Sequence, residues 1–251
     1  MKTSGNTILV TGGGSGIGAA LAQRWHDAGN HVIVAGRRQA ALDEAVAGRE
    51  QMAALTLDIA DAATIPAFAE RLVADHPALN VVVHMAGIMR RDDLTRGGGL
   101  DGAAETIATN LTGPILLTDA LVDHLAAQPD AAIVTVSSGL AFVPLTISPV
   151  YSATKAAVHS WSVSLREQLN GRVEVIELAP PGVQTGLTPG QESRPGYMPL
   201  DAFVDEVMDL FAQVPTPPEI LVERVKPLRN AEAEGAFAER LAMLTAAATR
   251  S

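Results

Sequence analysis

The hydrophobic residues of this chain gather in short runs, separated by longer alanine-rich stretches with helical spacing. Several runs are apolar at consecutive positions, as expected of strands that are buried on both faces of a sheet. Seven runs have this strand character: Thr7–Val10, His31–Ala35, Ala54–Leu57, Asn80–Val83, Ala132–Val136, Val173–Leu178 and Ile220–Val225.

Helical patterns lie between these runs, for example Ile17–Ala28, Ala40–Ala47 and Ile65–Asp75. Alternation of strand and helix from the start of the chain indicates βαβ units. The pattern therefore predicts the α/β class, with a doubly wound, Rossmann-type parallel sheet of about seven strands and helices on both faces.

No linker is long or polar enough to divide the chain, so residues 1–251 are expected to form a single domain. The most irregular stretch, Gly182–Leu200, is interpreted as an insertion over one edge of the sheet. After Ile220–Val225 we expect a C-terminal extension, about residues 226–251, with a helical pattern over Ala231–Ala247. The sequence leaves the role of this extension open.

Composition narrows the function classes. The chain is 47% hydrophobic, which is ample for a core, and its formal net charge of -10 argues against a nucleic-acid or anionic-membrane partner. The absence of cysteine excludes disulfides, cysteine nucleophiles and thiolate metal sites. The histidines show no metal-binding spacing, so no metal is expected. The N-terminus has no signal-peptide pattern and no apolar run reaches the length of a membrane span, so we expect a soluble cytoplasmic protein.

A glycine-rich turn follows the first predicted strand and opens the first predicted helix. Glycine lets the backbone turn sharply and approach a phosphate, while the helix N-terminus supplies amide donors and the positive end of a dipole. This context favours dinucleotide binding over a purely structural turn. The residues expected at this contact are Thr11, Gly12, Gly14, Ser15, Gly16, Ile17 and Gly18.

Tyr151 and Lys155 are four residues apart, which places them on one face of a helix. A free tyrosine has a pKa near ~10, and a neighbouring cation lowers that pKa by stabilising the phenolate. The pair is therefore a candidate acid/base, although many surface helices carry the same spacing by chance.

The spacing of Gly12, Gly16 and Gly18, T-G-x-x-x-G-x-G, resembles that of the short-chain dehydrogenase/reductase family. Within the family, Thr135–Ser152 and Ile220–Arg229 resemble the subgroup of DltE-type oxidoreductases, which is poorly defined by substrate. The resemblance covers nearly the whole chain, because further motifs follow in the family's order: Asp58, Ala86-Gly87-Ile88, Asn110, Ser137-Ser138, Tyr151, Lys155 and Thr185.

The resemblance implies a catalytic tetrad of Asn110, Ser138, Tyr151 and Lys155. Tyr151 exchanges a proton with the carbonyl or alcohol oxygen, Ser138 holds that oxygen, and Lys155 lowers the pKa of the phenol and binds the nicotinamide ribose. Asn110 kinks its helix and anchors a water that links Lys155 to solvent, unless its role is only structural. Ser137 is the nearest alternative to Ser138, which the family spacing favours.

The end of the second strand bears on the choice of cofactor. Gly36 stands where NAD-preferring relatives usually carry Asp, and Arg37 and Arg38 follow. Because a guanidinium suits a phosphate dianion, NADP(H) is favoured. NAD(H) stays possible if the two arginines only form a solvated helix start, or if Arg37 only stacks on adenine.

The remaining cofactor contacts are also implied by resemblance. Asp58 and Ile59 match the adenine contact, although Asp58 is equally suited to cap the next helix. Ala86 and Gly87 follow the fourth strand. Pro181, Val183 and Thr185 match the segment that holds the nicotinamide carboxamide.

Two segments are candidates for contact with substrate. Residues 186–200 are rich in Gly and Pro and suit a mobile loop that closes over substrate, or an ordinary surface loop. Phe142, Val143 and Leu145 lie between Ser138 and Tyr151, where they would line an apolar pocket or belong to the core.

The helix that carries Tyr151 continues with an apolar stripe of Ala157, Trp161, Leu165 and Leu169. In relatives this helix packs against its twin, so part of the stripe is a candidate interface of a homodimer or homotetramer.

Two departures from the family pattern affect the site. His84-Met85 replaces the usual pair of asparagines, of which one normally stabilises the sheet. Pro180-Pro181 replaces the usual Pro-Gly after the sixth strand and stiffens the turn.

The resemblance implies an NAD(P)(H)-dependent oxidoreductase that interconverts a ketone or aldehyde and an alcohol. One alternative is a non-catalytic NADP(H)-binding sensor on the same fold, which the complete tetrad disfavours. Another is an epimerase or dehydratase on a related fold, for which this chain leaves little room for a sugar-nucleotide domain.

Overall fold

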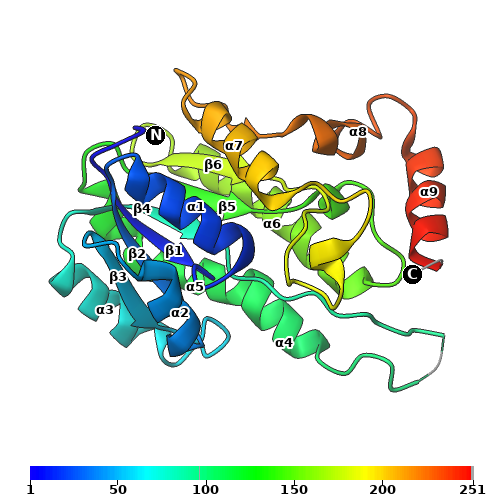
Figure 1. Ribbon diagram of the computed structural model, residues 1–251, viewed down its shortest axis with the longest axis horizontal. Helices are drawn as coiled ribbons and strands as arrows, with labels where there is room; N and C mark the ends of the chain where they lie inside the picture. The colour runs from blue at the N-terminus through cyan, green and yellow to red at the C-terminus, as the bar shows by residue number, and fades with distance from the viewer. Residues whose placement is uncertain (96, 250–251) are drawn as a thin grey trace.

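Seven parallel strands form one sheet at the centre of the molecule (Figure 1). The computed structural model describes residues 1–95 and 97–249. The strand order is β3-β2-β1-β4-β5-β6-β7. The bounds are β1 Thr7–Thr11, β2 His31–Gly36, β3 Met52–Thr56, β4 Leu79–His84, β5 Ala132–Val136, β6 Glu174–Leu178 and β7 Glu219–Ile220. The predicted fold class is confirmed.

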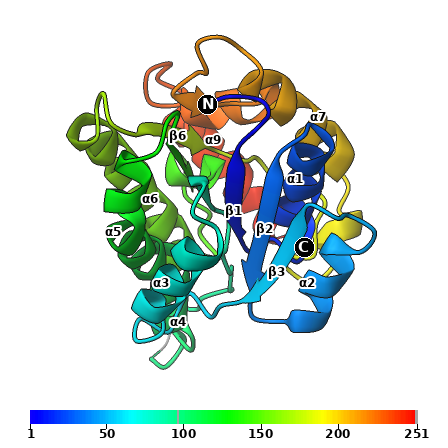
Figure 2. The same cartoon turned by 90° about the vertical axis from the view of Figure 1, so that its left-hand side faces the viewer.

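Helices cover both faces of the sheet, as Figure 2 shows from the side of β3. Helices α1, α2 and α7 cover one face of the sheet, where Trp25 of α1 and Phe203 of α7 are buried. Helices α3, α5 and α6 cover the other face, where each buries one leucine: Leu72, Leu121 and Leu165. The bounds are α1 Gly16–Asp27, α2 Gln39–Val46, α3 Ile65–Asp75, α4 Ala103–Ile107, α5 Gly113–Ala126, α6 Pro149–Gln168, α7 Leu200–Phe211, α8 Lys226–Arg229 and α9 Phe237–Thr249.

The sheet has a topological switch point between β1 and β4. From β1 the chain builds outward to β2 and β3, and then returns to β4 on the other side of β1. In open α/β sheets, ligands bind in the crevice beyond the carboxyl ends of strands at such a point. The turns after β1, β2, β4 and β5 all open at this edge.

A π-helical turn, Ala108–Thr112, joins α4 to α5 and contains Asn110. Single π-helical turns locally widen a helix and frequently mark functional sites. The expected kink at Asn110 therefore takes the form of one wide turn.

His84 is fully enclosed and its Nε2 lies 2.8 Å from the Thr118 hydroxyl oxygen of α5. Its ring also lies 6.0 Å from that of Trp161 in α6. Burial lowers the pKa of His84 to about 4, so the imidazole is neutral at physiological pH. This histidine thus ties β4 to α5 at the position where relatives carry asparagine.

The C-terminal third differs from the sequence prediction. Only Glu219 and Ile220 pair with β6, and the chain then turns into a short 3-10 helix, Glu223–Val225. The helix predicted over residues 231–247 begins later, because residues 231–236 form a turn after α8 and α9 starts at Phe237. The last two residues of the predicted extension, 250–251, lie outside the described residues.

The apolar stripe of α6 faces the sheet. Leu165 and Leu169 are buried in the core between α6 and the sheet, and Trp161 packs against the same cluster. The exposed apolar side chain of this helix is instead Val163, with Ile115 exposed on α5. Within the described ranges, no helix is long and apolar enough to cross a membrane.

Candidate active site

The glycine-rich turn lies directly beneath the start of α1. Gly12 and Gly16 have positive φ angles of 69° and 53°, which favour glycine. A Cβ on Gly18 would lie 2.4 Å from the Gly12 carbonyl oxygen, and one on Gly12 would lie 2.7 Å from Ala86 Cα. The turn therefore leaves backbone amides and a helix N-terminus open to a phosphate group, which fits a dinucleotide.

The carboxyl edge of the sheet carries a continuous groove made of two adjoining pockets. Gly12, Ser15, Ala86, Gly87 and Ile88 line both of them. We call the pocket beside Asp58 the Arg37 pocket and the one that contains the tetrad hydroxyls the Tyr151 pocket. All predicted cofactor residues line one or both: Thr11, Gly12, Gly14, Ser15, Gly16, Ile17, Gly18, Arg37, Arg38, Asp58, Ile59, Ala86, Gly87, Tyr151, Lys155, Pro181, Val183 and Thr185.

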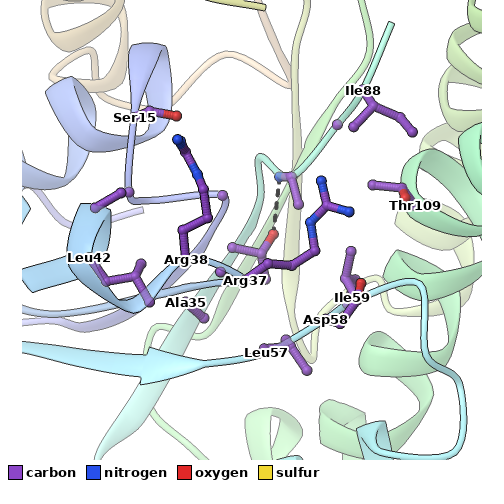
Figure 3. Close-up of a pocket in the computed structure, with 17 residues that line it drawn as sticks. Ser15, Ala35, Arg37, Arg38, Leu42, Leu57, Asp58, Ile59, Ile88 and Thr109 are labelled. Carbon is purple, nitrogen blue, oxygen red and sulfur yellow. Dashed lines mark hydrogen bonds between the residues drawn. The ribbon is translucent and has the colours of Figure 1, made fainter. Parts of the chain in front are cut away.

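The two arginines after β2 point in different directions (Figure 3). Arg37 reaches across the Arg37 pocket toward Thr109 and Ile88, whereas Arg38 points toward Ser15 of the glycine turn. Asp58 is exposed at the end of this pocket, and its Oδ1 accepts a hydrogen bond of 3.0 Å from the Ala60 amide. Asp58 thus caps a turn while it also lines the pocket.

Tyr151 and Lys155 are both buried on α6, with 7% and 5% of their surface exposed. The Lys155 ammonium lies 5.6 Å from the centre of the Tyr151 ring and donates a hydrogen bond of 2.8 Å to the Val136 carbonyl. The bond to Val136 fixes α6 to the carboxyl end of β5.

Burial changes the acid/base properties of both groups. It raises the pKa of Tyr151 to about 12, an effect that hydrogen bonding with Ser138 partly offsets and the nearby Tyr197 reinforces. Burial also lowers the pKa of Lys155 to about 8. Loss of hydration sets the net direction of the Tyr151 shift, and the lowering of the phenol pKa by Lys155 stays a prediction.

The two serines after β5 point to different partners. The Ser137 hydroxyl donates to the Glu177 carboxylate, beneath the groove. Ser138 hydrogen bonds with Tyr151, and its oxygen accepts the Leu140 amide at 3.1 Å. Both serines line the Tyr151 pocket, but Ser138 is the one that hydrogen bonds with the phenol.

Asn110 lies behind the pocket with 2% of its surface exposed. Its side chain accepts the Ile88 amide and donates to the Ile88 carbonyl, both at 2.9 Å. It also donates to the Thr154 hydroxyl at 3.2 Å. Asn110 thus joins the turn after β4 to α6 beside Lys155.

Gln191, which the sequence did not single out, holds the segment after β6 in place through hydrogen bonds. Gln191 is buried, and its amide donates to the Val183 carbonyl at 2.9 Å and to the Thr185 hydroxyl at 3.2 Å. The predicted loop 186–200 is also closed at its base, because Gln184 and Gly182 pair with Met198. Gly186, Leu187 and Gln191 of this loop line the Tyr151 pocket.

The predicted apolar pocket residues lie outside the groove. Val143 is fully buried, and Phe142 packs against His159 and against the Arg229 guanidinium, 4.8 and 4.7 Å away respectively. Leu145 does not line either pocket. The 3-10 turn Gly139–Ala141, which precedes these residues, packs against α8. Groove residues that were not predicted include Met85, Met89, Arg90, Glu105 and Val136.

A cluster of charged residues lies below the serines. Glu177 of β6 is fully buried, and its Oε2 lies 2.8 Å from His159 Nδ1. Glu219 receives two hydrogen bonds, of 2.7 and 2.9 Å, from Arg229 of α8. His159, Glu177 and Glu219 are close enough to share a metal ion, a grouping that their sequence spacing does not show. Because Arg229 and Ser137 already bind the two carboxylates, we make no metal proposal for this cluster.

The arrangement of sheet, glycine turn and buried Tyr-Lys pair defines a nucleotide-dependent dehydrogenase fold. The sequence pattern of the short chain dehydrogenase family matches residues 6–195. The chain belongs to this family.

Similar proteins agree with this assignment. The uncharacterized oxidoreductase DltE of Bacillus subtilis (strain 168) is 42% identical over 92% of this chain and 93% of its own length. The 2,3-dihydro-2,3-dihydroxybenzoate dehydrogenase of Escherichia coli (strain K12) is 33% identical over 72% and 71%. A short chain dehydrogenase from Burkholderia cenocepacia J2315, crystallised in complex with NADP, superposes with a TM-score of 0.82 at 23% identity over 96% and 99%.

Proposed function

We propose that this protein is a carbonyl reductase or alcohol dehydrogenase that interconverts a ketone or aldehyde and an alcohol. The observation that carries the proposal is the enclosure of Tyr151, Ser138 and Lys155 in one pocket that continues into the glycine-rich turn. This places the candidate proton donor and the nucleotide site in the same groove.

A reduced nicotinamide, when bound, supplies the hydride that a carbonyl carbon accepts. Tyr151 then gives its hydroxyl proton to the carbonyl oxygen, which completes the alcohol. A pKa of about 12 keeps this phenol protonated at neutral pH, as a proton donor requires. Ser138 holds the same oxygen through a hydrogen bond and stabilises the charge that develops on it.

Lys155 and Asn110 support this step from behind the pocket. The pKa of about 8 leaves Lys155 mainly charged at neutral pH, so it can stabilise the phenolate that remains after proton transfer. Its bond to Val136 and the three bonds of Asn110 hold α6, β5 and the turn after β4 in a fixed arrangement. These contacts fix the distance between phenol and substrate oxygen.

NADP(H) is the cofactor that we favour, with NAD(H) possible. Arg38 points toward Ser15, so one guanidinium and one hydroxyl converge beside the glycine turn (Figure 3). The second strand ends without a carboxylate that would repel a 2′-phosphate. The NADP in the Burkholderia relative is consistent with this preference.

We further propose a cytoplasmic homodimer or homotetramer. The exposed Val163 of α6 and Ile115 of α5 would be covered in such an assembly. Light scattering during size-exclusion chromatography tests this part; a monomer at all protein concentrations would contradict it.

The central experiment is a screen of ketones, aldehydes and alcohols with NADPH, NADH and their oxidised forms, followed by nicotinamide absorbance. We expect turnover of at least one carbonyl compound, and turnover at least about a hundredfold slower in Tyr151→Phe. Tight cofactor binding without turnover of any carbonyl or alcohol would instead favour a sensor.

A further inference from the structure

One carboxylate bridges two arginines at the rim of the groove. Glu105 of α4 accepts a hydrogen bond of 3.3 Å from Arg37 Nη1 and a second, short one from Arg90 Nη2. The three residues come from separate segments: the end of β2, the β4–α4 connection and α4 itself. We call them the rim ion network.

The network belongs to the nucleotide site. Arg37, Arg90 and Glu105 all line the Tyr151 pocket, and Arg37 also lines the Arg37 pocket. Their side chains are 52%, 46% and 37% exposed, so a bound ligand and solvent can both reach them.

Arg90 pairs with Glu105 and is itself packed against the backbone. The Arg90 chain lies against Gly102, where a Cβ would come within 2.7 Å of Arg90 Cδ. Gly102 also has a φ of 89°, in the region that favours glycine. Glu105 thus has two cationic partners at the rim, and Figure 3 shows Arg37 reaching across the Arg37 pocket toward Thr109.

This arrangement matters for a ligand with a phosphate on the adenosine ribose. A phosphate dianion and Glu105 would compete for the Arg37 guanidinium, and the two negative groups would repel each other. Arg38 forms no ion pair within residues 1–95 and 97–249, and it points toward Ser15. The strength of phosphate recognition then depends on how firmly Glu105 retains Arg37.

We propose that Glu105 is a specificity-determining residue, which weakens recognition of the 2′-phosphate by holding Arg37 away from it. The inference rests on the proposed use of a nicotinamide dinucleotide. It assigns Arg38 as the resident phosphate partner and Arg37 as a second partner that Glu105 restrains. Cofactor discrimination in this chain is therefore moderated by a carboxylate outside the second strand.

The test compares the wild-type chain with its Glu105→Gln variant in calorimetric titrations with adenosine 2′,5′-bisphosphate and adenosine 5′-phosphate. These ligands differ only in the 2′-phosphate, and the readout needs no substrate. We expect the variant to bind the bisphosphate about three- to tenfold more tightly and the monophosphate with less than about a twofold change. The gain should shrink as salt rises, because exposed charges are screened.

Asp205→Asn is the matched control. Asp205 of α7 forms an ion pair of 2.7 Å with Arg24, which lies in the last turn of α1, away from the glycine turn. Loss of the Asp205 carboxylate changes the net charge by the same amount as loss of the Glu105 carboxylate. We expect unchanged binding of both ligands. The double variant Arg37→Ala/Glu105→Gln should lose the gain, because the effect acts through Arg37.

The outcomes separate this inference from the proposed function. Equal effects of Glu105→Gln on both ligands, or weaker binding of the bisphosphate, would overturn the role of Glu105. A wild-type protein that binds both ligands equally would overturn the NADP(H) preference, but the inference would survive if Glu105→Gln then selects the bisphosphate. Absence of binding to both proteins would overturn the inference together with the proposed function.

Discussion

The two ends of the groove are built from different interactions. At the Tyr151 end, Tyr151, Lys155 and Asn110 are buried; Tyr151 hydrogen bonds with Ser138, and the other two bind the backbone. At the Arg37 end, the charged side chains are largely exposed and form ion pairs. Burial removes the water that would replace a lost partner, so substitutions at the first end should be costly and those at the second should adjust affinity by small factors.

The largest effect is expected for Tyr151→Phe, which removes the proton donor and leaves the ring in place. With a carbonyl substrate from the screen, turnover should fall about a hundred- to ten-thousand-fold while the Kd of the cofactor changes little. Tyr197→Phe is the control, since Tyr197 is the other tyrosine of the chain. Near-normal turnover of Tyr151→Phe would contradict the mechanism.

The buried carboxylate beneath the serines offers a direct comparison of ion pairs. Glu177→Ala should lower the free energy of unfolding by about 3 kcal/mol or more, because Ser137 and His159 lose a buried partner. Glu223→Ala, which removes an exposed pair with Lys226, should cost less than about 1 kcal/mol. Equal costs in urea unfolding would refute the distinction between buried and exposed carboxylates.

A pH series isolates the contribution of Lys155. Its pKa is about 8 in the folded protein against 10.5 for a free lysine, so between these values the unfolded chain binds more protons and stability rises with pH. Tyr151 acts in the opposite direction above pH 10, since its pKa rises from 10.0 to about 12 on folding and the folded state then binds more protons.

Lys155→Met should therefore abolish the rise in unfolding free energy above pH 8 and retain the fall above pH 10. Urea unfolding followed by tryptophan fluorescence measures both. If wild type and variant have parallel curves across this range, the ammonium is not destabilised by burial.

The smallest effect is expected at the exposed end. Arg37→Asp should shift the ratio of NADPH to NADH affinity toward NADH by about tenfold or less, because one exposed charge is replaced. Arg49→Asp changes the charge equally at a position outside both pockets and serves as the control. An unchanged ratio would remove Arg37 from cofactor selection and leave Arg38.

Much of the fold follows from local sequence. The apolar runs predict β1 to β6 to within about two residues, and α3 begins and ends at the predicted residues. The seventh strand is shorter than its apolar run, since Val222 begins a 3-10 turn and Val225 packs into the core without a strand partner. The hydrophobic pattern of the sequence indicates which residues are buried, and a buried residue need not belong to a paired strand.

The site shows the same division. The glycine turn and the Tyr-Lys pair are recognisable because their chemistry depends on fixed spacing along one element. The direction of the Tyr151 pKa shift depends on burial by the whole fold, which spacing does not contain. The contact of Arg37 with Glu105 joins residues 68 positions apart and is likewise set by the packing of α4.

Arg229 has a consequence for redesign by exchange of C-terminal segments. Arg229 of α8 binds Glu219 beside β6, and its guanidinium covers the ring of Phe142. These two contacts attach the C-terminal extension to the sheet and to the segment that follows Ser138. A chimaera joined before Arg229 would replace Arg229, and with it both contacts, together with the C-terminal segment. A junction after Arg229 would leave it intact and vary only α9, which touches the outer loops through Thr245 and the Ala248 carbonyl.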